Sequence, residues 1–247
     1  MSALSYFLED EGLPTVAISL IRVQTEKVGN PRSLWVPFEL GRPLGPPNDA
    51  AFQKSVIAAA LGLLTVTPGP VVLEDYPSDD PTSADLETWQ PPFALDVPDI
   101  DFSDHARLQS ALAAELGAVA PSYRRFVAAN RRTTFGISGL SIDACVAYLA
   151  SYLATAAPDN PIPSVAPVQA VRWAVDDVKA YYLEAMAAAP GIPSSRQVQR
   201  WFWDRTLAAR AVIALRKQLL ASEDSRVQAI GRMSLVPGVQ VLRLGLS

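Results

Sequence analysis

The chain has 247 residues, of which 49% are hydrophobic and 19% charged, so it is long enough for one large or two small domains. It holds one cysteine, Cys145, and one histidine, His105, which excludes an intramolecular disulfide, a CxxC redox pair and a zinc site of His and Cys. The N-terminal residues lack the pattern of a signal peptide, and the most apolar run, residues 56–64, is far shorter than the ~20 residues that span a bilayer. We therefore expect a soluble, cytoplasmic protein with no membrane contact.

The first strands and helices are predicted in residues 1–76, where short apolar runs alternate with helix-compatible segments. Strands are predicted over residues 15–20, 33–36 and 71–73. Helices are predicted over residues 3–11 and 22–28, and from an N-cap at Asn48 to the breaker Pro68-Gly69-Pro70. This order indicates an α/β part with a small parallel sheet and flanking helices, in which Glu74 and Asp75 follow the third strand at the edge where such sheets bind ligands.

The remainder of the chain is predicted to be mainly α-helical. Residues 77–104 are acidic and rich in proline, and we interpret them as a linker or a wrapping segment. A helical domain follows over residues 105–247, with helices predicted over residues 106–117, 122–130, 141–157, 167–189 and 195–220. Each long helix carries an apolar stripe that must be buried, so a helical bundle or cap is expected.

The charge is divided unevenly between the two parts. Residues 1–105 carry 5 Lys+Arg and 16 Asp+Glu, a net charge of −11, whereas residues 106–247 carry 16 and 9, a net charge of +7. This asymmetry can mark a nucleic-acid contact, or docking of the acidic half on the basic half of the same or a second copy. The arginines are spread over several predicted helices, so we favour a protein partner or a homo-oligomer over nucleic acid.

Residues 131–141, RRTTFGISGLS, are the clearest candidate site that the residues alone indicate. Arg131 and Arg132 supply two guanidinium groups, and Ser138 and Gly139 lie just before a predicted helix N-terminus, whose free amides attract anions. The segment lacks the pattern of a phosphate-binding loop, and we favour the simpler interpretation, an ordinary capped turn with solvated arginines. An anionic ligand and a simple turn both stay open.

Three other features receive a structural interpretation. Cys145 lies on an apolar stripe with no histidine near it in the sequence, so we expect a buried cysteine and not a nucleophile. Neighbours on a helix are about 100° apart, so at most two side chains of Trp201-Phe202-Trp203 are expected on the buried face. Asp176 and Asp177 are expected on a solvated face, with Arg172 paired to Asp176 at i,i+4.

Three stretches in the N-terminal part carry a family resemblance: GLPTVAISLIR at residues 12–22, PRSLWVPFELGRPLG at 31–45 and PNDAAFQ at 47–53. Their characteristic features are a Gly-x-Pro-Thr-Val strand entry, a Pro-Arg pair before the second strand, and a Gly-Arg-Pro-x-Gly loop followed by a helix start that contains Asp. In this order and spacing, over roughly residues 5–75, the sequence resembles the selenoprotein B family of the glycine, sarcosine, betaine and D-proline reductases.

The resemblance implies a reductase subunit that attacks the carbon–nitrogen bond of an amino-acid-like substrate with a selenocysteine or cysteine. In the family this nucleophile lies upstream of the Gly-x-Pro-Thr-Val element, and Cys145 does not match it. We expect that the chain either begins late relative to the family or has lost the redox centre, so that a partner or a missing segment supplies the nucleophile. The residues that carry over, as a loop that shapes a ligand site, are Arg32, Gly41, Arg42, Pro43, Gly45 and Asp49.

Two functions are consistent with these observations. The first is an oxidoreductase of amino-acid metabolism that acts on a small amino-acid-like substrate. The second is a noncatalytic anion-binding or complex-assembly protein, in which the Gly/Pro loop and the basic helical half hold an anion or a partner. No catalytic residue is assigned, and no cofactor or metal is expected.

Overall fold

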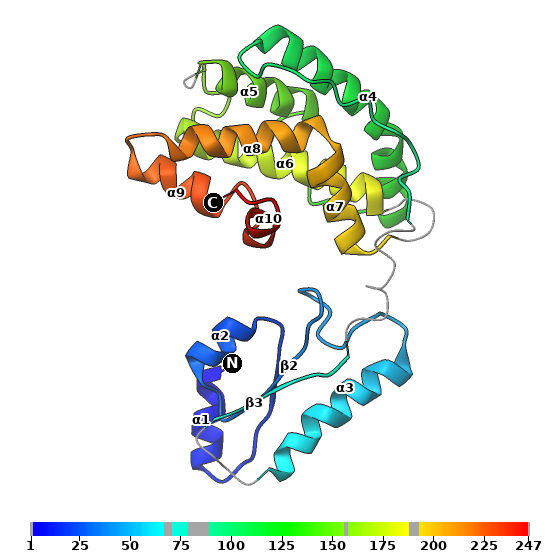
Figure 1. Cartoon of the computed structure of the whole chain (residues 1–247), viewed down its shortest axis with the longest axis vertical. Coiled ribbons are helices and arrows are strands. Elements are labelled where there is room, and N and C mark those ends of the chain that lie inside the picture. The colour runs from blue at the N-terminus through cyan, green and yellow to red at the C-terminus, as the bar shows by residue number, and fades with distance from the viewer. Residues whose placement is uncertain (1, 67–70, 79–88, 156–157, 188–192, 247) are drawn as a thin grey trace. The chain divides into compact units, whose positions relative to one another are not determined.

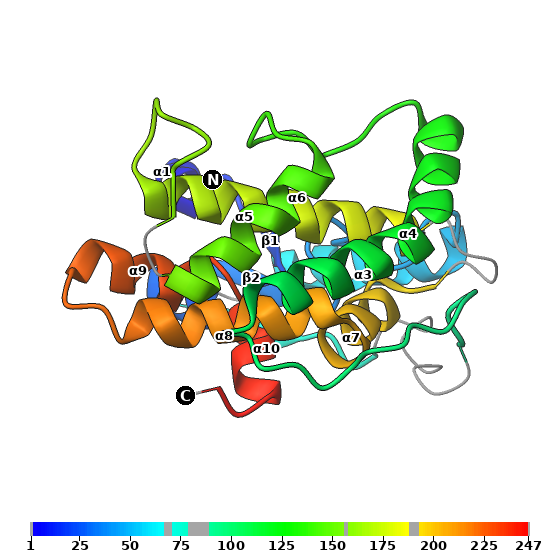
Figure 2. The ribbon, with the colours of Figure 1, turned by 90° about the horizontal axis from the view of Figure 1, so that it is seen from above.

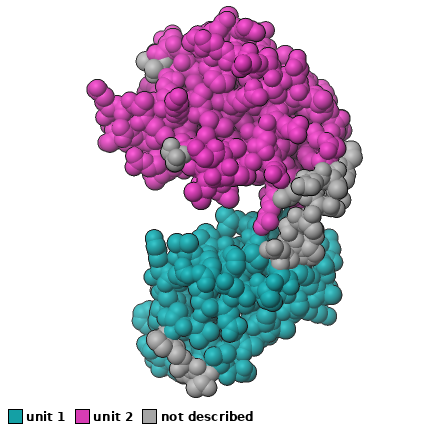
Figure 3. All heavy atoms as spheres, in the orientation of Figure 1, with its two compact units in different colours: residues 1–87 teal, residues 88–247 magenta. Residues whose placement is uncertain are grey.

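A computed structural model describes residues 2–66, 71–78, 89–155, 158–187 and 193–246 (Figure 1). The chain divides into two compact units, residues 1–87 (unit 1) and residues 88–247 (unit 2) (Figure 3). Unit 1 is α/β and unit 2 is helical, which confirms the predicted fold class. Within the described ranges, no helix is both long and apolar enough to cross a membrane.

Unit 1 contains a three-stranded parallel sheet, as predicted, with the strand order β1-β2-β3. Its elements are α1 (Ser2–Asp10), β1 (Ala17–Ser19), α2 (Arg22–Val28), β2 (Arg32–Trp35), α3 (Ala50–Gly62), the 3₁₀ turn η1 (Leu63–Thr65) and β3 (Val72–Asp75). In register, Leu34 of β2 lies opposite Ile18 of β1 and Glu74 of β3. The strands lie between α1 and α2 on one side and α3 on the other (Figure 1). The predicted breaker at residues 68–70 lies outside the described residues.

The core of unit 1 forms where β2 and the residues after it meet α3. Leu34 and Val36 are buried against Val56 and Ala60 of α3, which repeat at the i,i+4 spacing of one helix face. The predicted N-cap of α3 is wrong by one residue, because the cap is Asp49, whose Oδ1 accepts a hydrogen bond of 3.0 Å from the Phe52 amide. Aspartate accepts this bond well, and its charge suits the positive end of the helix dipole.

Unit 2 is a set of packed helices (Figures 1 and 2). They are α4 (His105–Asn130), α5 (Ile142–Thr155), α6 (Pro167–Ala187), α7 (Ser195–Arg205), α8 (Leu207–Leu220), α9 (Ser225–Met233) and α10 (Gly238–Arg243). α6 packs against both α4 and α5, and α8 packs against α5 and α9. The predicted apolar stripes line one continuous core.

Helix boundaries in unit 2 differ from the prediction in three places. The helices predicted on either side of Pro121 are a single helix, α4. Leu116 and Val119 before the proline are buried, Ser122 after it is buried and Tyr123 packs against the same core, and this packing outweighs the ~3 kcal/mol cost of proline in a helix interior. The helix predicted over 195–220 is two helices, since Thr206 adopts an extended conformation (φ −122°, ψ 146°) and caps α8. The short helices α9 and α10 were not predicted.

The segment that precedes α4 belongs to unit 2. Ile100 is buried in the helical core, and Trp89, Phe93, Leu95, Val97 and Phe102 pack against the same core, so the described part of the predicted linker is a wrapping segment. Phe93 packs edge-on against Trp201 with ring centroids 6.2 Å apart. Because α7 is covered by this segment as well as by α6, all three side chains of Trp201-Phe202-Trp203 are buried, and the expectation of at most two on the buried face is wrong.

Candidate functional site

The Gly/Pro loop of unit 1 follows β2 at the carboxyl edge of the sheet. Its backbone turns twice, with the Arg42 amide donating to the Glu39 carbonyl at 2.9 Å and the Gly45 amide to the Arg42 carbonyl at 3.0 Å. A side chain at Gly45 (φ +83°) would place its Cβ 2.4 Å from the Phe52 ring, so the loop requires glycine there. The loop exposes Arg42 and Pro43 to solvent.

Two of the six residues expected from the family resemblance, Arg32 and Asp49, make contacts that stabilise unit 1 itself. Arg32 is buried, and its Nη1 lies 2.5 and 2.6 Å from the two carboxylate oxygens of Glu9, which joins β2 to α1. This guanidinium lowers the pKa of Glu9. Asp49 caps α3, so the structure brings only Gly41, Arg42, Pro43 and Gly45 together in one loop.

The third strand ends in an ion pair at the same edge of the sheet. Asp75 accepts hydrogen bonds from Arg22 Nε at 2.9 and 3.2 Å, and Arg22 also pairs with Glu26. The pair joins the start of α2 to the end of β3, and the two residues are 53 positions apart in the chain. The acidic end of β3 therefore already has a cationic partner from its own unit.

The predicted anion site in unit 2 holds an anion of the protein itself. Asp177 accepts backbone hydrogen bonds from Gly136 at 2.6 Å, Ile137 at 3.0 Å and Ser138 at 2.9 Å, and a further bond from the Ser138 hydroxyl. These three successive N–H groups precede the predicted helix start and form a concavity that binds an anion. Asp177 is 0% exposed, so its predicted place on a solvated face is wrong, whereas Asp176 pairs with Arg172 at 3.7 Å as expected.

A second carboxylate, Glu184, holds the start of residues 131–141 by hydrogen bonds. Glu184 accepts hydrogen bonds from the Thr133 hydroxyl at 2.6 Å and from the amide and hydroxyl of Thr134, both at 2.7 Å. Arg131 and Arg132 are exposed, as is Gly139. Ligand binding by these arginines and by Ser138 and Gly139 stays a prediction.

Cys145 occupies the helical core, as predicted. Its side chain is 0% exposed and lies 3.5 Å from the Ser138 hydroxyl, measured from Sγ to Oγ. Burial raises the pKa of the thiol to about 11. The thiol is therefore protonated at neutral pH and shielded from any ligand in solution, so this residue does not supply an activated nucleophile.

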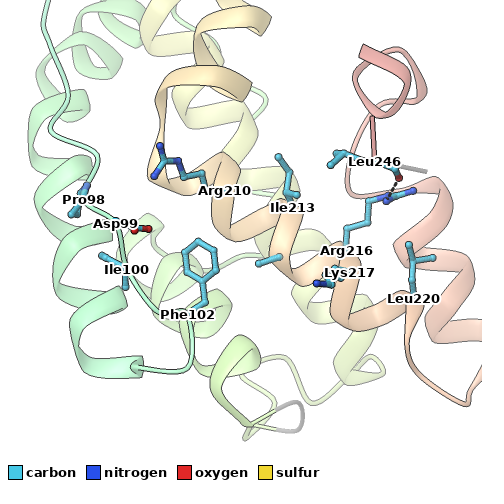
Figure 4. Close-up of a pocket in the computed structure, with 11 residues that line it drawn as sticks. Pro98, Asp99, Ile100, Phe102, Arg210, Ile213, Arg216, Lys217, Leu220 and Leu246 are labelled. Atoms are coloured by element: carbon cyan, nitrogen blue, oxygen red, sulfur yellow. Dashed lines mark hydrogen bonds between the residues drawn. The ribbon is translucent and has the colours of Figure 1, made fainter. Parts of the chain in front are cut away.

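Unit 2 contains a cavity of about 550 Å³ that the sequence did not reveal (Figure 4). It lies along α8, between the wrapping segment and Leu246. Ile100 and Phe102 form its apolar wall on the side of the segment, and Ile213 and Leu220 form the opposing wall on α8. Such a mostly apolar hollow with a few polar groups is typical of small-molecule sites.

Three cations and one carboxylate line this α8 cavity. Arg210 and Lys217 are exposed and stand two helical turns apart on α8, and Lys217 forms no ion pair with a described carboxylate. Arg216 donates a hydrogen bond of 2.7 Å from Nη1 to the Leu246 carbonyl, and its buried Nε has no partner. Asp99 is the single acidic residue of the lining, so the cavity favours an anion.

The sequence held a partial signal for this cavity. Arg210, Ile213, Lys217 and Leu220 repeat at the three- and four-residue spacing of one helix face, and the C-terminal half was recognised as basic. The other wall could not be found in the same way, because Phe102 reaches α8 only through the tertiary fold. No pattern along the chain connects it with a residue more than one hundred positions away.

The described residues contain no group of three or more His, Cys, Asp and Glu side chains that could hold a metal ion. No protein-family model, no curated protein and no solved structure matches the chain. A function is therefore assigned from the geometry of the chain's own residues.

Proposed function

We propose that unit 2 binds a small anion with an apolar body in the α8 cavity, and that this binding is noncatalytic. The observation that carries the proposal is that Arg210, Arg216 and Lys217 line an apolar hollow whose lining holds one carboxylate, Asp99. Neither the cysteine nor the histidine of the chain lines the cavity. The lining can hold and orient a ligand, and it offers no thiol or imidazole to react with it.

The apolar wall and the charges have different roles in this proposal. Burying about 200 Å² of apolar ligand surface contributes about 5 kcal/mol, most of which is offset by the loss of translational and rotational freedom. Arg210 and Lys217 are exposed, so each contributes about 1 kcal/mol or less. The wall therefore supports affinity, and the cations select an anionic head group over a neutral or cationic one.

Calorimetric titration of the full chain with octanoate, octanol and octylamine tests this selection. We expect octanoate to bind most tightly, and Arg210→Gln and Lys217→Gln each to weaken it about fivefold, the equivalent of about 1 kcal/mol. Arg232→Gln is the matched control, because Arg232 is exposed on α9 and does not line the cavity. Octylamine binding as tightly as octanoate, or an equal loss in the control, would refute the proposal.

Reductase activity in unit 1 is a separate prediction from the family resemblance. A dithiol-driven assay with glycine, betaine, sarcosine and D-proline tests it directly. Turnover that disappears in Cys145→Ser would contradict the structural role of this buried thiol. Turnover that persists would point to a nucleophile supplied by another segment or partner.

A further inference from the structure

We propose that unit 1 holds a second, chemically different binding site, a groove between α1, β1 and α2 that takes an uncharged small molecule with an amide group. The groove has a volume of about 550 Å³. Residues 15–21, which include the edge strand β1, form one wall, and Leu4 and Leu8 of α1 form another. The groove is built within unit 1 and does not depend on the proposed function of the α8 cavity.

The lining selects against a charged occupant. Every residue that lines the groove is uncharged, although unit 1 as a whole is acidic. A charged group transferred from water into this groove would lose hydration and gain no countercharge, which is strongly unfavourable. The ligand chemistry is therefore the opposite of that at the α8 cavity, where three cations line the wall.

Asn30 gives the groove a specific hydrogen-bonding group. Asn30 is one of the residues that line the groove and is only 4% exposed, and its buried side-chain Oδ1 has no hydrogen-bond partner. Its Nδ2 forms no hydrogen bond with any described residue either. Buried carboxamides in native proteins are rarely left without partners, so this group indicates a missing partner.

The side chains of Thr15, Ser19 and Thr25 of the groove are already hydrogen-bonded within unit 1, whereas those of Ser5 and Gln24 form no hydrogen bond with a described residue. Thr25 Oγ1 donates a hydrogen bond of 2.9 Å to the Ile21 carbonyl and is also bonded to Ser19 Oγ. Gln24 is exposed and Ser5 is half-buried, so both can bond to water, and Asn30 is the buried polar side chain of the lining that still lacks a partner among the described residues. An amide ligand supplies both a donor and an acceptor, so it can pair with either end of the Asn30 carboxamide, whereas an ether or a ketone can pair with only one.

The test uses the ¹⁵N-labelled full chain titrated with hexanamide, and separately with hexanoate, in two-dimensional NMR spectra. We expect hexanamide to shift the amide signals of Ala17, Ile18 and Ser19 and the side-chain NH₂ signal of Asn30 in a saturable manner. Asn30→Leu should weaken hexanamide at least tenfold, while Asn130→Leu, the same substitution at an exposed position at the end of α4, should leave the affinity unchanged.

A second variant covers the case in which Asn30→Leu fails to fold. Leu40 lines the groove but is 74% exposed, so Leu40→Asp places a charge at the rim without disturbing the core, and it should weaken hexanamide at least threefold. The inference is overturned if hexanamide leaves the β1 signals unmoved, or if hexanoate shifts them equally. Hexanoate shifts confined to α8 would support the α8 cavity independently, so the two sites can fail separately.

Discussion

Glu115 is the buried group whose removal should most disturb unit 2. It lies on α4 and is 4% exposed, yet its carboxylate accepts hydrogen bonds from the Tyr182 hydroxyl at 2.8 Å and from the amides of Leu207 at 2.6 Å and Ala208 at 3.0 Å. The two amides belong to the first turn of α8, so a residue of α4 caps a helix that lies about ninety positions later in the chain. Burial raises the pKa of Glu115, and these three hydrogen bonds act against that shift.

The size of the effect follows from the groups left without a partner. Glu115→Ala leaves one hydroxyl and two amides unpaired in the interior, and each such group costs about 1–3 kcal/mol. Water that enters the space left by the side chain recovers part of this cost, so we expect a loss of about 4 kcal/mol in the free energy of unfolding. Glu115→Gln keeps the shape and one oxygen acceptor but turns an NH₂ toward a donor, and should cost about 2 kcal/mol.

Urea unfolding followed by tryptophan fluorescence measures these losses. Four of the five tryptophans, Trp89, Trp173, Trp201 and Trp203, belong to unit 2, so the signal is dominated by the unit that contains Glu115. Glu223→Ala is the control, because Glu223 is exposed and should change the free energy by less than about 0.5 kcal/mol. A loss below about 1 kcal/mol in Glu115→Ala would refute the assignment of Glu115 as the cap of α8.

Two other predictions concern buried groups of unit 2. Asp177→Ala should cost about 3 kcal/mol and speed amide exchange at residues 136–138, measured by hydrogen–deuterium exchange, since it removes the acceptor of three backbone amides; unchanged exchange there would contradict this role. The pKa of Cys145 is raised by burial from 9.0 to about 11, so above pH 9 the unfolded state loses this proton before the folded state does. The wild type should therefore lose about 2 kcal/mol of stability relative to Cys145→Ala between pH 9 and pH 11, and equal stability differences at pH 7.5 and pH 11 would exclude it.

Much of unit 1 could be predicted because its signals are local. The β-branched residues before Leu20 favour an extended strand, and Gly29, which adopts φ +65°, ends α2 in the left-handed conformation that glycine prefers. The error at the start of α3 is also local in origin. Asn48 and Asp49 are adjacent and equally good capping residues, and only the backbone decides which of them the helix uses.

In unit 2 the apolar stripes were predictable and the breaks between helices were not. Pro121 is a strong local stop signal, yet α4 continues through it because residues on both sides are buried in the same core. At Thr206 no strong breaker is present, and α8 begins there because Glu115 and the Thr206 hydroxyl satisfy the free amides of its first turn. In both cases a tertiary contact overrides the local preference.

The candidate sites show more clearly which features local sequence signals predict and which depend on tertiary contacts. The sequence predicted an anion at the arginines and the helix start of residues 131–141, whereas the amides that hold a carboxylate are those of residues 136–138, and the carboxylate is Asp177, 39 positions after Ser138. Asn30, in contrast, gave no signal at all, because an asparagine beside a helix end is common in ordinary turns. Its importance comes from burial without a hydrogen-bond partner, which is a property of the folded environment.

By itself, the sequence determined an α/β part followed by a helical part, a core position for Cys145, and a basic C-terminal half, because periodicity, side-chain chemistry and charge are written along the chain. Only the tertiary structure decided which charged side chains have a hydrogen-bond or ion-pair partner within the protein and which do not. Asp177 and Glu115 reach their hydrogen-bond donors only on folding, whereas Lys217 forms no ion pair with a described carboxylate and lines a cavity. The physical reason is that hydrogen bonds and ion pairs depend on distances of about 3 Å in space, and separation along the chain does not determine those distances.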